Sequence, residues 1–158
     1  MQQETMIKMV LDAWTVHISR ASKLFNELTD EQLSHEASPG RNTGVYLLGH
    51  LAAVHDGMLP LLGIGEKLYP QLEEVFIKNP DTSGLAKPAT KDLRNYWNEV
   101  NKKLADHFSG FTVEEWFQKH SAVPAEDFIK EPHRNKLNLV LNRTTHLASH
   151  YGQMLYVK

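Results

Sequence analysis

Apolar residues recur at intervals of three and four along four long segments of this 158-residue sequence. That spacing places them on one face of an α-helix. The segments cover about residues 7–28, 43–62, 90–108 and 135–158, and little of the chain alternates apolar and polar residues as a half-buried strand would. The pattern predicts an all-α protein, and four long amphipathic segments predict a four-helix bundle.

Short capping motifs mark the ends of further helices. Thr29 with Gln32, and Thr112 with Glu115, have the spacing of a capping box, which predicts a short helical turn after each threonine. Thr90 is predicted to cap the third long helix.

The two longest connections are read as loops within a single domain, residues 1–158. Residues 63–91, rich in Gly, Pro, Asp and Ser, form a long crossover between the second and third helices, with a short helix predicted to begin at Pro70. Residues 121–133 are predicted to be a second loop. A chain of this length buries a core without help from a metal, so any metal is expected to serve function rather than folding.

Composition excludes several classes of function. Seventeen basic and 19 acidic side chains give a net charge of -2, and no run of like charge would follow a phosphate backbone, so nucleic acid is not an expected partner. No leader pattern and no unbroken membrane-length apolar run are present, which predicts a soluble, cytoplasmic protein without a membrane partner. The absence of cysteine excludes disulfides, a protein thiol nucleophile and Cys-based metal sites. Any metal must therefore be held by histidine and oxygen ligands.

The segment "HLASHYGQM" near the C-terminus carries His146 and His150. Residues four apart lie about 40° apart on a helix, so the two imidazoles can bind one ion. The pair flanks the apolar stripe of the fourth helix, and Asn142, Arg143 and Gln153 share its side. This arrangement predicts a polar pocket at a seam of the bundle.

Two histidines are too few for a tight metal site, so a third ligand is expected on another helix. In "LLGHLAAVHDG", His50 stands off the apolar stripe of the second helix, as the C-terminal pair does on its own helix, whereas His55 points into the stripe. We therefore predict His50 as the third ligand. His55 is read as either a hydrogen-bonded core histidine or a pocket-lining group, and His17 on the first helix is a weaker candidate.

The combination of "NTGVYLLGHLAAVHDGM" with "HLASHYGQM" resembles the DinB-like (YfiT-like) family of proposed metalloenzymes. The resemblance covers essentially the whole chain, including "LTDEQLSHEASPGRNTG". It implies a four-helix bundle of DinB/YfiT type, in which one histidine of the second helix and an HxxxH pair of the fourth bind a divalent metal ion, commonly zinc or nickel. Carried over by position, these ligands are His50, His146 and His150. The resemblance also implies a homodimer and, as a co-substrate, a low-molecular-weight thiol such as bacillithiol, mycothiol or glutathione.

Such a ligand set suits catalysis. Three neutral imidazoles leave at least one coordination position open, where a water of pKa about 7 or a thiolate could bind. Because the chain has no cysteine, the thiolate would arrive with a small-molecule substrate. Arg143 is a candidate for binding a substrate carboxylate, Gln153 or Asn142 for orienting an imidazole, and His55 for lining the pocket.

Two known metal motifs are excluded. A zincin needs Glu after its first histidine, where this chain has Leu147, and no Glu-x-x-His pair of a di-iron site lies near these histidines. Three functions remain open: a metal-dependent enzyme, either a thiol S-transferase or a hydrolase; a metal-binding stress protein without turnover; and a metal-free dimeric interaction module.

The remaining histidines and the large aromatic residues are expected to have ordinary roles. Packing in the core is predicted for Trp14, Trp97, Trp116 and Tyr151. Exposure to solvent is predicted for His35, His107, His120 and His133.

Overall fold

The computed structural model describes residues 1–157, and within that range it contains helices and no strand, only two isolated bridges. The predicted all-α class is confirmed. Four helices are much longer than the others, and they match the four periodic segments of the sequence: α1 (Gln2–Glu27), α3 (Gly44–Asp56), α6 (Thr90–Phe108) and α9 (Lys136–Met154).

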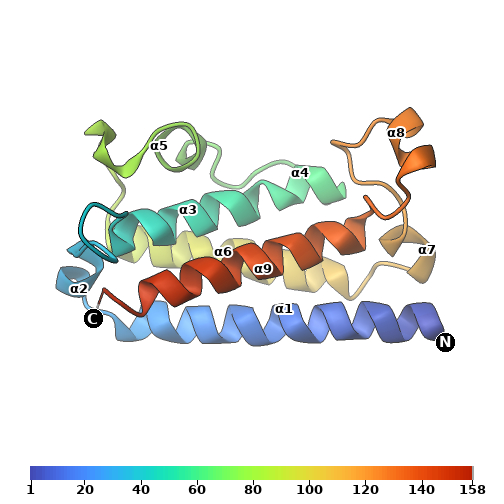
Figure 1. Ribbon diagram of the computed structural model, residues 1–158, viewed down its shortest axis with the longest axis horizontal. Coiled ribbons are helices and arrows are strands. Elements are labelled where there is room, and N and C mark those ends of the chain that lie inside the picture. The colour runs from blue at the N-terminus through green and yellow to red at the C-terminus, as the bar shows by residue number, and fades with distance from the viewer. Residues whose placement is uncertain (158) are drawn as a thin grey trace.

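The long helices lie side by side (Figure 1). Helix α1 packs most extensively on α9, and α3 packs most extensively on α6. Smaller contacts of α3 with α9 and of α1 with α6 close the ring. The molecule is therefore built from two helix pairs, and α3 meets α9 at a seam between them.

The second periodic segment is divided in two. Helix α3 ends at Asp56, and α4 (Met58–Leu62) follows after Gly57, whose N–H lies within hydrogen-bonding range of the carbonyl oxygens of both Ala53 and His55. Residues 44–62 are apolar and long enough to cross a membrane, but 67% of that window is buried inside the protein. Such burial is typical of a core helix, since a membrane-spanning helix would turn its apolar side chains outward to lipid.

The starts of three helices can be compared with the predicted capping residues. Both predicted capping boxes are present, Thr29 with Gln32 at α2 (Asp30–Ser34) and Thr112 with Glu115 at α7 (Val113–Trp116). The prediction for Thr90 was wrong: α6 begins at Thr90 itself, its N-cap is Ala89, and no side chain caps it.

Each of the two predicted loops contains a helical segment that the sequence did not predict. Residues 121–133 include α8 (Ala125–Lys130), a helix of six residues that is too short to give a periodic pattern. The crossover contains the short helix predicted there, α5 (Leu72–Phe76), which begins two residues after Pro70, and also a 3-10 turn, η1 (Asp81–Ser83), which was not predicted. Figure 1 shows α5 on the outer side of α3, where it covers the helix that carries His50.

Candidate metal centre

Three histidines from two helices meet at the seam between α3 and α9. The Nε2 atom of His146 lies 3.3 Å from Nε2 of His50 and 3.1 Å from Nε2 of His150. One ring nitrogen of each residue falls within 4.8 Å of the others, and all three side chains are partly buried. The structure thus brings together the three histidines that the sequence predicted as ligands.

Hydrogen bonds orient two of the three rings. His50 Nδ1 lies 2.8 Å from the carbonyl oxygen of Phe76, and His150 Nδ1 lies 2.9 Å from Oε1 of Gln153. Both oxygens are acceptors, so each Nδ1 carries the proton and each Nε2 keeps a lone pair. Outer hydrogen bonds of this kind fix the tautomer of metal-binding histidines.

The donor set fits a divalent cation. With Zn–N distances of about 2.0–2.1 Å, neighbouring ligand nitrogens of a tetrahedral site lie about 3.3 Å apart. The two closest spacings, 3.1 and 3.3 Å, match that value. The Nε2 lone pairs of His50 and His150 both face Nε2 of His146. A proton on His146 Nε2 can pair with only one of them, whereas a cation between the rings would pair with the Nε2 lone pairs of all three histidines.

Burial favours the neutral form of these imidazoles. It is the main cause that lowers the pKa of His146 to about 4, followed by the charges of neighbouring groups. Burial also lowers the pKa of His50, although the hydrogen bond to Phe76 opposes the shift. Neutral imidazole is the form that binds a metal, so these two rings are ready to bind at neutral pH.

A large pocket opens beside the cluster. Its volume is about 930 Å³, and it includes His150 and Gln153 on α9 and the side chains of the loop before α3. The residues that line it are Ala37, Ser38, Gly40, Arg41, Asn42, Ser149, His150, Gly152, Gln153, Leu155 and Tyr156. A small molecule can therefore approach the cluster from the His150 side.

Arg143 lies one turn before His146 on α9 and is partly buried. Its Nε atom is buried without a hydrogen-bond partner, and no carboxylate within residues 1–157 forms an ion pair with it. It does not belong to the lining of the large pocket described above. Arg143 thus supplies an uncompensated positive charge near the histidines, separate from the pocket lining.

His55 lies apart from the cluster. It is fully buried, its ring lies 4.8 Å from that of Trp14 and 4.9 Å from that of Trp97, and Nδ1 lies 2.8 Å from Oδ1 of Asn101. Of the two interpretations that the sequence left open, this position corresponds to a core histidine. His17 is partly exposed and is not one of the clustered residues.

Sequence reasoning missed two features of the structure. The carbonyl of Phe76 is a backbone group of a loop-rich segment, and no side-chain pattern in the sequence marks it. His120, expected in solvent, is partly buried, with its Nδ1 atom enclosed and unpartnered among the described residues. Burial also lowers the pKa of His120.

Comparison with known protein families identifies the family of this chain. A search of the curated proteins finds none that matches this sequence. A comparison with protein families matches residues 13–154, nearly the whole chain, to the DinB superfamily. The match includes α3 and α9 with all three clustered histidines, and on this evidence the chain belongs to the DinB superfamily.

Proposed function

We propose that this protein binds one divalent metal ion through His50, His146 and His150 and acts as a metal-dependent enzyme. The observation that carries the proposal is the convergence of three Nε2 atoms at 3.1 and 3.3 Å, with two of the rings oriented by hydrogen bonds at Nδ1. Borderline nitrogen ligands favour zinc or nickel, which are the metals we propose.

The adjoining pocket supports an enzyme over a metal-storage protein. Three protein ligands leave a coordination position open, and a pocket of about 930 Å³ adjoins His150. Pockets for small molecules have volumes of about 300–1,000 Å³. When bound, the ion would supply Lewis-acid activation of a water or of a low-molecular-weight thiol, so the activities we propose are those of a hydrolase or a thiol S-transferase. A stress protein that only stores metal would have no need of such a pocket.

Each neighbouring residue has a proposed role. Gln153 holds the His150 ring in its ligating orientation through the contact at Nδ1. Arg143, a cation without an ionic partner in residues 1–157, is suited to bind the anionic group of a substrate. His55 is enclosed by Trp14 and Trp97 and would act only through its neighbours.

The test is metal content measured by elemental mass spectrometry on untagged protein. We expect about one zinc or nickel ion per chain in the wild type, loss of that ion in His146→Ala, and retention in His107→Ala, which removes an exposed histidine outside the cluster. Protein that remains metal-free after reconstitution with zinc and with nickel would overturn the proposal and favour a dimeric interaction module. Metal binding without turnover of thiols and electrophiles would instead favour the stress protein.

A further inference from the structure

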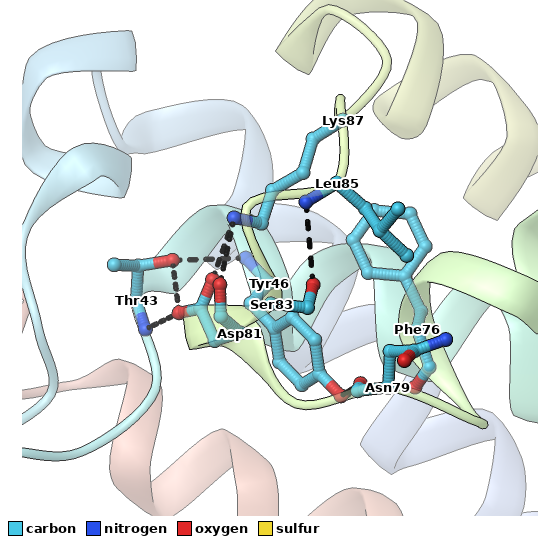
Figure 2. Close-up of polar contacts among 8 residues, drawn as sticks. All are labelled: Thr43, Tyr46, Phe76, Asn79, Asp81, Ser83, Leu85 and Lys87. Carbon is cyan, nitrogen blue, oxygen red and sulfur yellow. Dashed lines mark hydrogen bonds and ion pairs between the residues drawn. The ribbon is translucent and has the colours of Figure 1, made fainter.

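The segment from Phe76 to Lys87, which we call the clasp, is fastened to the N-terminal half of α3. It runs from the last residue of α5 through η1 to the chain that leads into α6. Polar contacts join the clasp to Thr43, the residue before α3, and to Tyr46 and His50 of α3. Figure 2 shows the outer part of this arrangement, with Asp81 between Thr43 and Lys87.

Asp81 forms the first fastening. Its Oδ2 atom accepts hydrogen bonds from the backbone N–H of Thr43 at 2.7 Å and from the Thr43 hydroxyl at 2.8 Å. Its Oδ1 atom lies 2.7 Å from the ammonium of Lys87, and only 9% of the Asp81 side chain is exposed. Thr43 is the N-cap of α3, so Asp81 ties the clasp to the start of the helix that carries His50.

Tyr46 forms the second fastening, one turn further along α3. Its hydroxyl donates to the carbonyl oxygen of Asn79 at 2.7 Å, and its ring packs against that of Phe76, with centroids 5.6 Å apart. The Tyr46 ring also lies nearly parallel to the imidazole of His50, with centroids 6.3 Å apart. Tyr46 therefore contacts both the clasp and the proposed ligand.

Gly49 makes the third fastening possible. A Cβ atom added at this residue would lie 2.7 Å from Cδ1 of Phe76 and closer still to two other ring atoms. Phe76 is fully buried, so its ring has no free space into which to move. The missing side chain at Gly49 lets Phe76 pack directly on the backbone of α3, and its carbonyl oxygen then lies 2.8 Å from His50 Nδ1.

We propose that the clasp is a positioning device: by placing the Phe76 carbonyl at His50 Nδ1, it fixes the tautomer of His50 and thereby sets the affinity of the three-histidine site for metal. Tyr46, Gly49 and Asp81 are positioning residues that act through Phe76. The inference rests on the proposed metal site and extends it to a crossover segment that begins 26 residues after His50, the nearest proposed ligand. Removing an outer hydrogen bond of a metal-binding histidine weakens metal affinity by about 10- to 100-fold.

The test measures the zinc dissociation constant, by competition with a chelating dye, in Gly49→Ala, Tyr46→Phe and Asp81→Asn. We expect Gly49→Ala to weaken zinc binding by about 10- to 100-fold, and the other two variants to weaken it less. The matched control is Gly110→Ala, where the nearest atom to an added Cβ is the His107 carbonyl oxygen at an ordinary 3.5 Å. Tyr46→Phe keeps the aromatic packing and loses only the hydroxyl, so it serves if Gly49→Ala does not fold.

A second readout separates positioning from general destabilisation. In metal-free protein, nitrogen-detected NMR of the imidazoles should show His50 as the Nδ1–H tautomer in the wild type and as a mixture in Gly49→Ala and Tyr46→Phe. His150, which bonds to Gln153, should keep its tautomer in all of them. Wild-type zinc affinity in these variants, or an unchanged His50 tautomer, would overturn the clasp proposal and leave the metal site standing. Absence of zinc binding in the wild type would overturn the proposed function and the clasp proposal with it.

Discussion

His55 is a titratable residue that the fold keeps away from water. Burial lowers the pKa of its imidazole from an ordinary 6.5 to about 3, although the hydrogen bond with Asn101 opposes the shift. Since the Asn101 amide nitrogen donates to the carbonyl of Trp97, its oxygen is left to accept from His55 Nδ1–H. The protein therefore folds around a neutral His55.

This burial makes stability depend on pH. Between the folded pKa of about 3 and the unfolded value of 6.5, the unfolded chain binds more protons at His55. The contribution of neutral His55 is thus complete above pH 6.5 and is lost progressively as the pH falls toward 3. We expect metal-free protein to lose about 2 kcal/mol of unfolding free energy at this site between pH 7 and pH 5, measured by urea unfolding. In His55→Gln, which does not titrate, an equal loss over that range would contradict the prediction.

Arg143 and Arg41 offer alternative positions for the anionic group of a substrate. Arg143 is partly buried without an ionic partner in the described chain, whereas Arg41 is exposed and lines the pocket. Because a hydrogen bond to a charged group is worth about 1.5–3 kcal/mol, we expect Arg143→Ala to raise the Michaelis constant by about 10- to 100-fold. Metal content should not change. If Arg41→Ala raised the Michaelis constant and Arg143→Ala did not, the anionic group would bind at Arg41 in the pocket loop and not at Arg143.

The clustering of His50, His146 and His150 was predictable from sequence, and the surroundings of these residues were not. Residues four apart on a helix must share a face, and wheel position selected His50 over His55 because only His50 stood off the apolar stripe. The hydrogen bond from His50 to the Phe76 carbonyl joins segments 26 residues apart. A backbone acceptor has no residue type of its own, so no spacing rule identifies it.

Arg94 of α6 joins the third long helix to the end of the first. Its guanidinium donates to the carbonyl oxygens of Phe25 at 2.9 Å and of Leu28 at 2.8 Å, and also to the carboxylate of Asp30. The last carbonyls of a helix have no partner within the helix, and a cation there also interacts favourably with the helix dipole. Arg94 thus caps α1 from a neighbouring helix.

Replacing this arginine should destabilise the protein. In Arg94→Met the two carbonyl groups lose a charged donor while the aliphatic packing is kept, so we expect a loss of about 2 kcal/mol in unfolding free energy. Thermal and urea unfolding would measure it. Asp30→Asn is the control, because the Asp30 side chain is 69% exposed and its ion pair with Arg94 is screened by solvent. Equal losses of unfolding free energy in the two variants would show that the ion pair with Asp30, and not the contact with the two carbonyl groups, stabilises the protein.

The helices that sequence predicted best are those whose signal is local or strongly periodic. The capping boxes at Thr29 and Thr112 involve residues three apart, and both form as expected. Helix α8 has only six residues and none of them is buried, so it leaves no apolar stripe to detect. At Thr90 the sequence offered a good capping residue, but the helix starts there instead, with Ala89 as its N-cap and no side-chain cap. A favourable capping residue therefore did not by itself fix where this helix begins.

The three-histidine cluster lies between the two helix pairs. His50 belongs to the α3–α6 pair, and His146 and His150 belong to the α1–α9 pair. An ion held by both would connect the pairs at the seam where α3 meets α9. A ligand that binds only the folded protein stabilises it in proportion to the logarithm of its concentration over its dissociation constant. Metal binding should therefore raise the unfolding free energy of the whole protein.

We expect zinc to raise the melting temperature of the whole protein in a single transition. At a free zinc concentration 100 times the dissociation constant, the gain is about 2.7 kcal/mol. For a domain of this size that corresponds to about 5–10 °C. Scanning calorimetry of metal-free protein with added zinc would measure the shift, and a chelator should reverse it. His146→Ala should show no shift, while His107→Ala should behave as the wild type does, because His107 lies outside the cluster. An equal shift in His146→Ala would mean that zinc stabilises the fold from another position and that the seam between α3 and α9 is held by packing alone.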